Sequence, residues 1–312
     1  MNILIQSANA VLPLFILMMI GFFVRKTSLV SEEVLVKVNR LNFYVGLPAI
    51  CFHSISGGDF TTVTDLKLVL TVALGILGFF AISGLIVPRF VSDPKRRGSI
   101  ILAVSRSNDV LFGLAVARAL VPAEQMAPVM LAISIAALLT NTFSVIAMEL
   151  NRGNKVRISV LVKKVLLNPI VIACTAGLLF SFAGIKLPVF LSSPIESLAG
   201  MATPLAFIII GSRIHKDAFL HDRKTIATVS AVKLLLVPAI MLAVGFLVGL
   251  NKVEMLAVLC IFASPCATAS YTLACEMGGD ERLSSELIAV TSVISILTMF
   301  ICTYVLTLLG GI

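Results

Sequence analysis

Long apolar segments separated by short polar loops run along the whole chain. At a rise of about 1.5 Å per residue, most of these segments are long enough to cross a hydrocarbon core of about 30 Å as helices. The pattern predicts ten spans, at residues 8–24, 34–56, 66–88, 98–121, 126–149, 160–182, 195–213, 225–249, 254–276 and 287–309. The expected fold class is therefore an all-α polytopic membrane protein.

Composition supports this class. Of 312 residues, 59% are hydrophobic and only 13% are charged, and a soluble domain of this size could not cover so much apolar surface. The net charge of +8 lies mainly in the loops, which favours a lipid bilayer as the partner and argues against nucleic acid.

Most of the 24 lysine and arginine residues fall in alternate loops. Basic loops stay in the cytoplasm, so the bias predicts a multi-pass protein of the cytoplasmic (inner) membrane. With ten spans, both termini are expected on the extracytoplasmic side.

Two of the apolar segments carry polar breaks at mid-span. Residues 100–121 contain Arg106, Ser107, Asn108 and Asp109, and residues 254–277 are interrupted at Ser264-Pro265. Lipid cannot satisfy charged side chains or freed backbone groups, so such breaks survive only inside protein or beside water. Matching breaks in two halves of a chain are typical of a transporter's substrate site.

An internal repeat connects the two halves. A spacing of 156 residues relates Pro13, Gly21 and Pro48 to Pro169, Gly177 and Pro204. We therefore expect a first five-helix repeat at 1–152 and a second at 153–312. An odd number of spans inserts the second repeat upside down, which brings the two breaks together near the bilayer midplane.

The chemistry of the breaks favours an anion. Pro265 lacks a backbone donor and frees carbonyl groups one turn earlier, while Ser264, Thr268 and Tyr271 offer hydroxyls. Where the half-helices restart, their positive ends face the gap beside Asn108, Ser107 and Arg106. The substrate expected here is a small organic anion, a mono- or dicarboxylate.

Each charged or titratable candidate also has a structural interpretation. Arg106 and Asp109 are three residues apart and could form an intrahelical ion pair, whereas Asp109 could instead carry a transported proton. Lys233 is either a coupling cation or a side chain that reaches the inner surface. His53 is either a satisfied polar group or a proton relay.

The remaining candidates concern packing and helix geometry. Asn108 either contacts the substrate or joins helices by hydrogen bonds. Pro265 is interpreted as a crossover proline, while Pro48 and Pro204 mark either helix breaks or simple kinks.

Other functional classes find little support. There is no phosphate-binding loop of Walker type, no Cys/His cluster with metal-ligand spacing and no nucleophile with a convincing histidine partner. We expect no enzyme activity, no cofactor and no metal site. The coupling ion, H⁺ or Na⁺, stays open, as does uniport. A channel and a membrane-embedded ligand sensor are the alternatives.

Three stretches carry a family resemblance: NRLNFYVGLPAICF at 39–52, RSNDVLFG at 106–113 and ASPCATASYTLACEMGGDERL at 263–283. In order and spacing they resemble the auxin efflux carrier family, which includes bacterial organic-acid permeases and plant auxin exporters. The resemblance implies broken, crossing helices 4 and 9, with Asn108 at the substrate and Pro265 at the crossover.

The resemblance also implies a scaffold half that forms a homodimer and a transport half that moves past it like an elevator. One departure from the family pattern is that Leu114 and Ala115 follow Gly113 where a proline is common. The break in helix 4 is then softer and is carried by Asn108 and Gly113. Related bile-acid/sodium symporters share the architecture, which makes sodium coupling the alternative mechanism.

Overall fold

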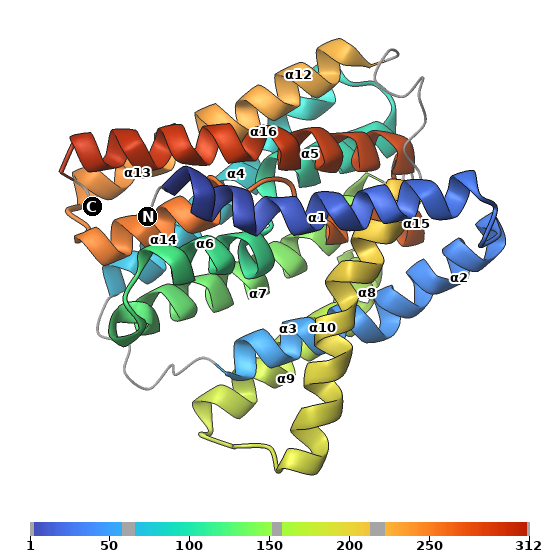
Figure 1. The fold of residues 1–312 in the computed structure, drawn as a ribbon, viewed down its shortest axis with the longest axis horizontal. Helices are drawn as coiled ribbons and strands as arrows, with labels where there is room; N and C mark the ends of the chain where they lie inside the picture. The colour runs from blue at the N-terminus through green and yellow to red at the C-terminus, as the bar shows by residue number, and fades with distance from the viewer. Residues whose placement is uncertain (1–2, 58–65, 152–157, 213–221, 311–312) are drawn as a thin grey trace.

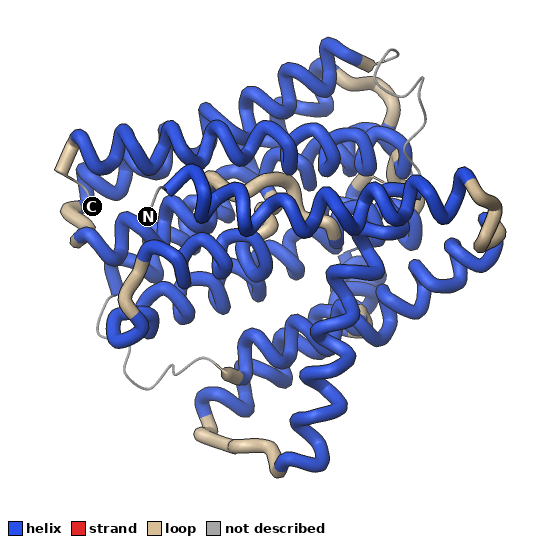
Figure 2. Tube along the Cα trace, in the orientation of Figure 1, coloured by secondary structure: helices blue, strands red, loops and turns tan. Residues whose placement is uncertain are grey.

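The computed structural model describes residues 3–57, 66–151, 158–212 and 222–310, and its regular elements within these ranges are helices (Figures 1 and 2). In the labels below, η1, η2 and η4 are π-helical and η3 is a 3₁₀ turn. The elements are α1 (Ile3–Lys26), α2 (Glu32–Leu41), η1 (Asn42–Gly46), α3 (Leu47–Ser56), α4 (Leu66–Phe90), α5 (Pro94–Ser105), η2 (Asp109–Gly113), α6 (Leu114–Leu120), η3 (Ala123–Gln125), α7 (Met126–Leu150), α8 (Ile158–Leu166), α9 (Pro169–Phe182), α10 (Val189–Ser212), α12 (Arg223–Ala231), η4 (Val232–Leu236), α13 (Val237–Val248), α14 (Lys252–Phe262), α15 (Ala269–Met277) and α16 (Glu281–Leu308).

Each predicted span coincides with one helix or with a run of consecutive helices. In the described part of the chain, five helices or continuous helical runs are individually long and apolar enough to cross a membrane: Leu66–Phe90, Met126–Leu150, Val189–Ser212, Arg223–Val248 and Glu281–Leu308. The all-helical class is thus confirmed.

The span predicted at 160–182 is not one helix. α8 ends at Leu166, and the Asn168 side chain accepts a hydrogen bond from the Ile170 N–H at 2.9 Å to start α9. Pro169 fills the first helical position, where its missing N–H has no cost. The predicted span therefore corresponds to two consecutive helices with a break at Leu167-Asn168.

The chain also stays helical at two prolines where breaks were expected. Pro48 lies in the first turn of α3, directly after the π-turn η1, whose wider ring accommodates the proline without ending the helical path. Pro204 lies inside the continuous helix α10. Neither proline therefore ends the helical path, which corrects the expectation of helix breaks at Pro48 and Pro204.

The helices form two groups. α1, α2, η1, α3, α9 and α10 pack mainly on one another and are called the scaffold group. α4 to α7 and α12 to α16, with their η turns, form the crossover group. In Figure 1, α3, α9 and most of α10 lie below the crossover group, whereas α1 crosses the view between α16 above and α14 and α6 below.

The scaffold group is held by direct backbone contact between α1 and α10. A Cβ atom on Gly21 would collide with the Ile208 carbonyl, and one on Gly211 would collide with the Met18 carbonyl. Glycine at both positions lets the two helices approach more closely than side chains would permit. The two helices are therefore in direct backbone contact at both glycines.

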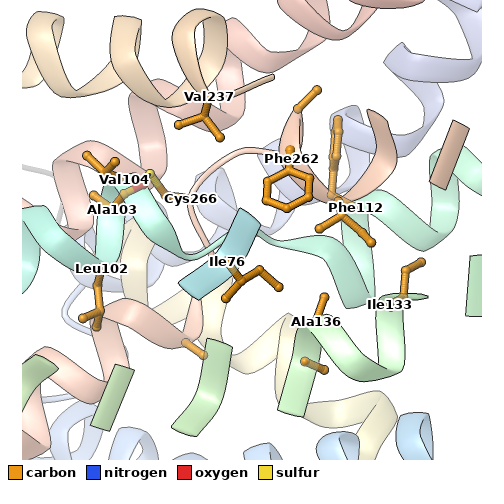
Figure 3. Close-up of a cluster of buried hydrophobic side chains, with 14 of the residues drawn as sticks. Ile76, Leu102, Ala103, Val104, Phe112, Ile133, Ala136, Val237, Phe262 and Cys266 are labelled. Atoms are coloured by element: carbon orange, nitrogen blue, oxygen red, sulfur yellow. Dashed lines mark hydrogen bonds between the residues drawn. The ribbon is translucent and has the colours of Figure 1, made fainter. Parts of the chain in front are cut away.

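Both chain breaks lie deep inside the crossover group. Figure 3 shows apolar side chains around them, including Ile76 of α4, Ala136 of α7 and Phe262 at the end of α14. The Cys266 thiol donates to the Ala103 carbonyl at 3.1 Å. Protein thus surrounds the non-helical backbone, which is the condition for tolerating it at membrane depth.

Candidate functional site

The two breaks predicted from the sequence meet in the structure. Ser107, after α5, forms an isolated antiparallel bridge with Cys266, after α14. The Asn108 N–H donates to the Pro265 carbonyl at 2.8 Å. The breaks therefore satisfy part of each other's backbone, and the two half-helices η2/α6 and α15 restart from this crossover.

Local chemistry explains why each helix stops. Arg106 has an extended backbone, with φ −109° and ψ 117°, and its N–H makes the last helical hydrogen bond of α5. On the other segment Pro265 has no N–H to donate. The following Cys266 N–H leaves the helical pattern and donates to the Thr291 hydroxyl of α16 at 3.2 Å.

Gly113 is the last residue of the π-turn η2, which belongs to the break in the span predicted at 98–121. A Cβ atom at this position would lie 2.5 Å from the Cys260 carbonyl and 3.1 Å from the Ser264 hydroxyl. Gly113 thus lets η2 pack against α14. It does not line the crossover cavity described below.

We expect Gly113→Ala to lower the melting temperature by several degrees, because a backbone carbonyl cannot move aside as a flexible side chain can. The matched control is Gly78→Ala in α4, where a Cβ meets nothing within 4 Å and the exchange should be neutral or stabilising. Thermal unfolding of both variants in detergent measures the difference. Equal melting temperatures would contradict the close packing at Gly113.

A small cavity of about 50 Å³ lies at the crossover, between the two helix groups. The crossover group contributes Arg106 to Asp109, Asn141 of α7 and Thr268. The scaffold group contributes Cys51 of α3 and Thr203 of α10. Most of the cavity's polar groups come from the broken segments.

Arg106 is held from one side. Its Nη2 donates to Asn141 Oδ1 at 2.5 Å, and Asn141 Nδ2 in turn contacts the Cys51 sulfur at 3.4 Å. Asp109 Oδ1 accepts from the Val110 N–H at 3.0 Å. Among the described residues Arg106 and Asp109 form no ion pair, which corrects that interpretation. The chain between them is extended, so helical spacing does not apply.

Four polar atoms on residues that line the cavity have no hydrogen-bond partner within the described part of the chain: Arg106 Nη1, Asn108 Nδ2, Asp109 Oδ2 and Thr203 Oγ1. Arg106, Asn108 and Asp109 are each at most 5% exposed, and Thr203 is half-buried. A buried polar group without a partner costs about 1–3 kcal/mol. The residues around the cavity therefore offer two donors, one carboxylate acceptor and one hydroxyl, a set that is suited to a polar ligand.

Lys233 lies behind the crossover. It belongs to the π-turn η4, is 1% exposed, and donates from Nζ to the Ser107 hydroxyl at 2.5 Å. Its ammonium group does not extend to the inner surface, so the interpretation of Lys233 as a side chain that reaches that surface is wrong. A fixed positive charge instead sits beside the broken segment.

Other predicted residues lie outside the cavity. The Ser264 hydroxyl donates to the Cys260 carbonyl at 2.5 Å and is fully buried. Tyr271 is buried at 1% exposure, away from the cavity wall. Pro265 takes part through its carbonyl alone.

Two larger hollows lead outward from the crossover cavity. One, of about 380 Å³, shares Ile50, Val110 and Thr203 with the cavity. The next, of about 340 Å³, shares His53 and Arg118 with the first hollow. They follow the side where α3 ends and α10 begins. His53 therefore belongs to this access path and does not reach the crossover.

Sequence reasoning missed Asn141, Thr203 and Cys51. For Asn141 a signal was present, because Thr140-Asn141-Thr142 interrupts an otherwise apolar span at its middle. Thr203 and Cys51 carried no such signal, since single small polar residues are common in membrane helices.

Comparison with known proteins agrees with this architecture. Residues 7–303 match the family described as membrane transport protein. An uncharacterized transporter from Methanothermobacter thermautotrophicus is 22% identical over 307 residues, which cover 97% of this chain and 100% of the relative. The resemblance noted in the sequence is confirmed over nearly the whole length. The chain belongs to the membrane transport protein family, that of the auxin efflux carriers.

Proposed function

We propose that the protein is a secondary carrier that moves a small organic anion across the cytoplasmic membrane by alternating access around the crossover. The observation that carries the proposal is the cavity between the two helix groups. Arg106 and Asn108 line it from an interrupted helix, and each carries a buried donor without a partner in the described part of the chain. Donors that are fixed and buried favour an anion over a neutral solute.

An elevator-type movement is part of the proposal. The scaffold group would stay fixed while the crossover group carries the site past it. Between the groups, the Thr272 hydroxyl donates to Asn39 Oδ1 at 3.1 Å on one side of the crossover. The hollows described above open on the other side. We interpret this as the state open to the extracytoplasmic side.

The proposal keeps the expected arrangement in the membrane. It comprises two inverted five-helix repeats, at 1–152 and 153–312, with both termini outside the cytoplasm. A homodimer through the scaffold group is included, as the family resemblance implies.

The fixed charges favour transport driven by the membrane potential. Lys233 already places a positive charge beside Ser107, so a sodium ion bound there would meet a like charge. One monovalent anion per cycle responds to the potential by about 2.3 kcal/mol per 100 mV, which corresponds to about 50-fold accumulation.

Flux into proteoliposomes tests the proposal. With a potassium diffusion potential, we expect saturable movement of a labelled monocarboxylate that follows the sign of the potential and ignores sodium. Asn108→Ala should reduce the flux, because it removes one donor from the cavity.

Each other outcome has a distinct meaning. Binding without flux would indicate a sensor, and flux that does not saturate would indicate a channel. Dependence on sodium would favour the sodium-coupled alternative. The absence of both binding and flux for every carboxylate would refute the organic-anion assignment.

A further inference from the structure

The unpartnered atoms of the cavity specify more than a negative charge. Arg106 uses Nη2 on Asn141 and Asp109 uses Oδ1 on Val110, so each keeps one atom for a ligand. Together with Asn108 Nδ2, the broken segment offers two hydrogen-bond donors and one carboxylate acceptor, and the Thr203 hydroxyl of α10 adds a group that can donate or accept. The first three groups follow one another on one short segment.

A simple carboxylate matches this set poorly. It carries acceptors only, so it would bind Arg106 and Asn108 but leave Asp109 Oδ2 unpaired or facing a like charge. A ligand that adds one O–H group to the carboxylate supplies the missing donor. The acceptor on Asp109 therefore selects for a second functional group on the acid.

The charges near the cavity limit the ligand further. Arg106 and Lys233 are positive and Asp109 is negative, and all three are at most 5% exposed. Buried charges are tolerated when they are compensated locally. The three groups together leave one net positive charge. A monoanion cancels this charge, an amino acid zwitterion leaves it uncompensated, and a dianion would leave a net negative charge.

The size of the cavity agrees with a small acid. A water molecule needs about 10–15 Å³ of this kind of volume, so 50 Å³ accommodates about three to five atoms of that size. A two- or three-carbon acid would fit after small movements of the side chains that line the cavity. A larger acid would fit only if the scaffold group and the crossover group moved apart.

We propose that the preferred substrate is a small monovalent 2-hydroxy acid, whose carboxylate binds Arg106 and Asn108 and whose hydroxyl donates to Asp109. This inference rests on the proposed carrier function and adds the substrate class to it.

Matched acids test the inference by equilibrium binding to the purified full-length protein. Lactate, propionate and pyruvate share size and charge but differ at carbon 2, which carries a donor, nothing, or an acceptor. We expect lactate to bind at least about tenfold more tightly than propionate, because one hydrogen bond to a charged group contributes about that much affinity. Pyruvate should bind most weakly.

Asp109→Asn reverses the polarity of the recognition group. The side-chain oxygen can still accept from the Val110 N–H, so the new amide N–H₂ would face the cavity. Because the charge change affects all three acids alike, the readout is the ratio of affinities. We expect the ratio of lactate to pyruvate affinity to fall by at least about tenfold. Ser230→Ala, which alters a buried hydroxyl outside the cavity, should leave the ratio unchanged.

The outcomes separate this inference from the function on which it rests. Equal binding of lactate and propionate, with no change of ratio in Asp109→Asn, overturns the inference but leaves an organic-anion carrier. Tighter binding of alanine than of lactate overturns the charge argument. If Asp109→Asn instead abolishes pH-dependent flux at unchanged ratios, Asp109 carries a proton. Failure of every acid to bind or move refutes the proposed function itself.

Discussion

Arg106→Ala is expected to weaken the binding of a small carboxylate by about 10- to 100-fold, because hydrogen bonds to charged groups contribute about 1.5–3 kcal/mol. Arg106 lines the cavity, with Nη2 bound to Asn141 and Nη1 without a partner in the described part of the chain. The loss should therefore appear in affinity and, through it, in flux at low substrate concentration. Titration of the purified protein with the acid measures it.

Arg106→Lys is the matched control. It keeps the charge but loses the planar fork, so it cannot hold Asn141 and the ligand together and should give an intermediate affinity. The melting temperature of both variants must also be measured without ligand. Arg106→Ala removes the cation nearest to Asp109 on the broken segment, and this change could lower the stability of the fold itself. Unchanged affinity in a folded Arg106→Ala protein would show that the crossover is not the anion site.

A disulfide between positions 39 and 272 is expected to abolish flux until it is reduced. Thr272 of α15 and Asn39 of α2 are hydrogen-bonded at 3.1 Å, yet they belong to different helix groups. If the crossover group moves along the scaffold group, this contact must open for the site to reach the other side. Asn39→Cys with Thr272→Cys, oxidised in proteoliposomes, should lose essentially all transport, and reductant should restore it.

The control cross-link stays within one group. The hydroxyls of Ser83 in α4 and Ser105 in α5 lie 2.8 Å apart, and both helices belong to the crossover group. Ser83→Cys with Ser105→Cys should permit flux after oxidation. Both pairs require a background without the six native cysteines. Full transport by the oxidised 39/272 pair would contradict movement between the groups.

The two breaks show what sequence reasoning can reach. Pro265 and the cluster at 106–109 are incompatible with a plain membrane helix, whatever surrounds them, so the location of the breaks follows from covalent chemistry and the properties of lipid. Their meeting also followed, because both lie at similar depths in spans that enter from opposite sides.

The hydrogen-bond partners did not follow. An ion pair between Arg106 and Asp109 is the natural expectation for a helix, but the unwound chain turns Arg106 to Asn141, which is 35 residues away. The Lys233 side chain could likewise extend in several directions from an isolated helix. Only the packing of η4 against the broken segment brings its ammonium group to Ser107.

The sequence by itself determined that the chain is helical, lies in a membrane and is interrupted twice by polar groups. Each of these properties depends on local composition and on the inability of lipid to satisfy polar groups. Only the tertiary structure decided which polar atoms of Arg106, Asn108 and Asp109 remain free for a ligand. It also placed the cavity between two helix groups. Both features depend on contacts between distant segments, which local sequence patterns do not encode.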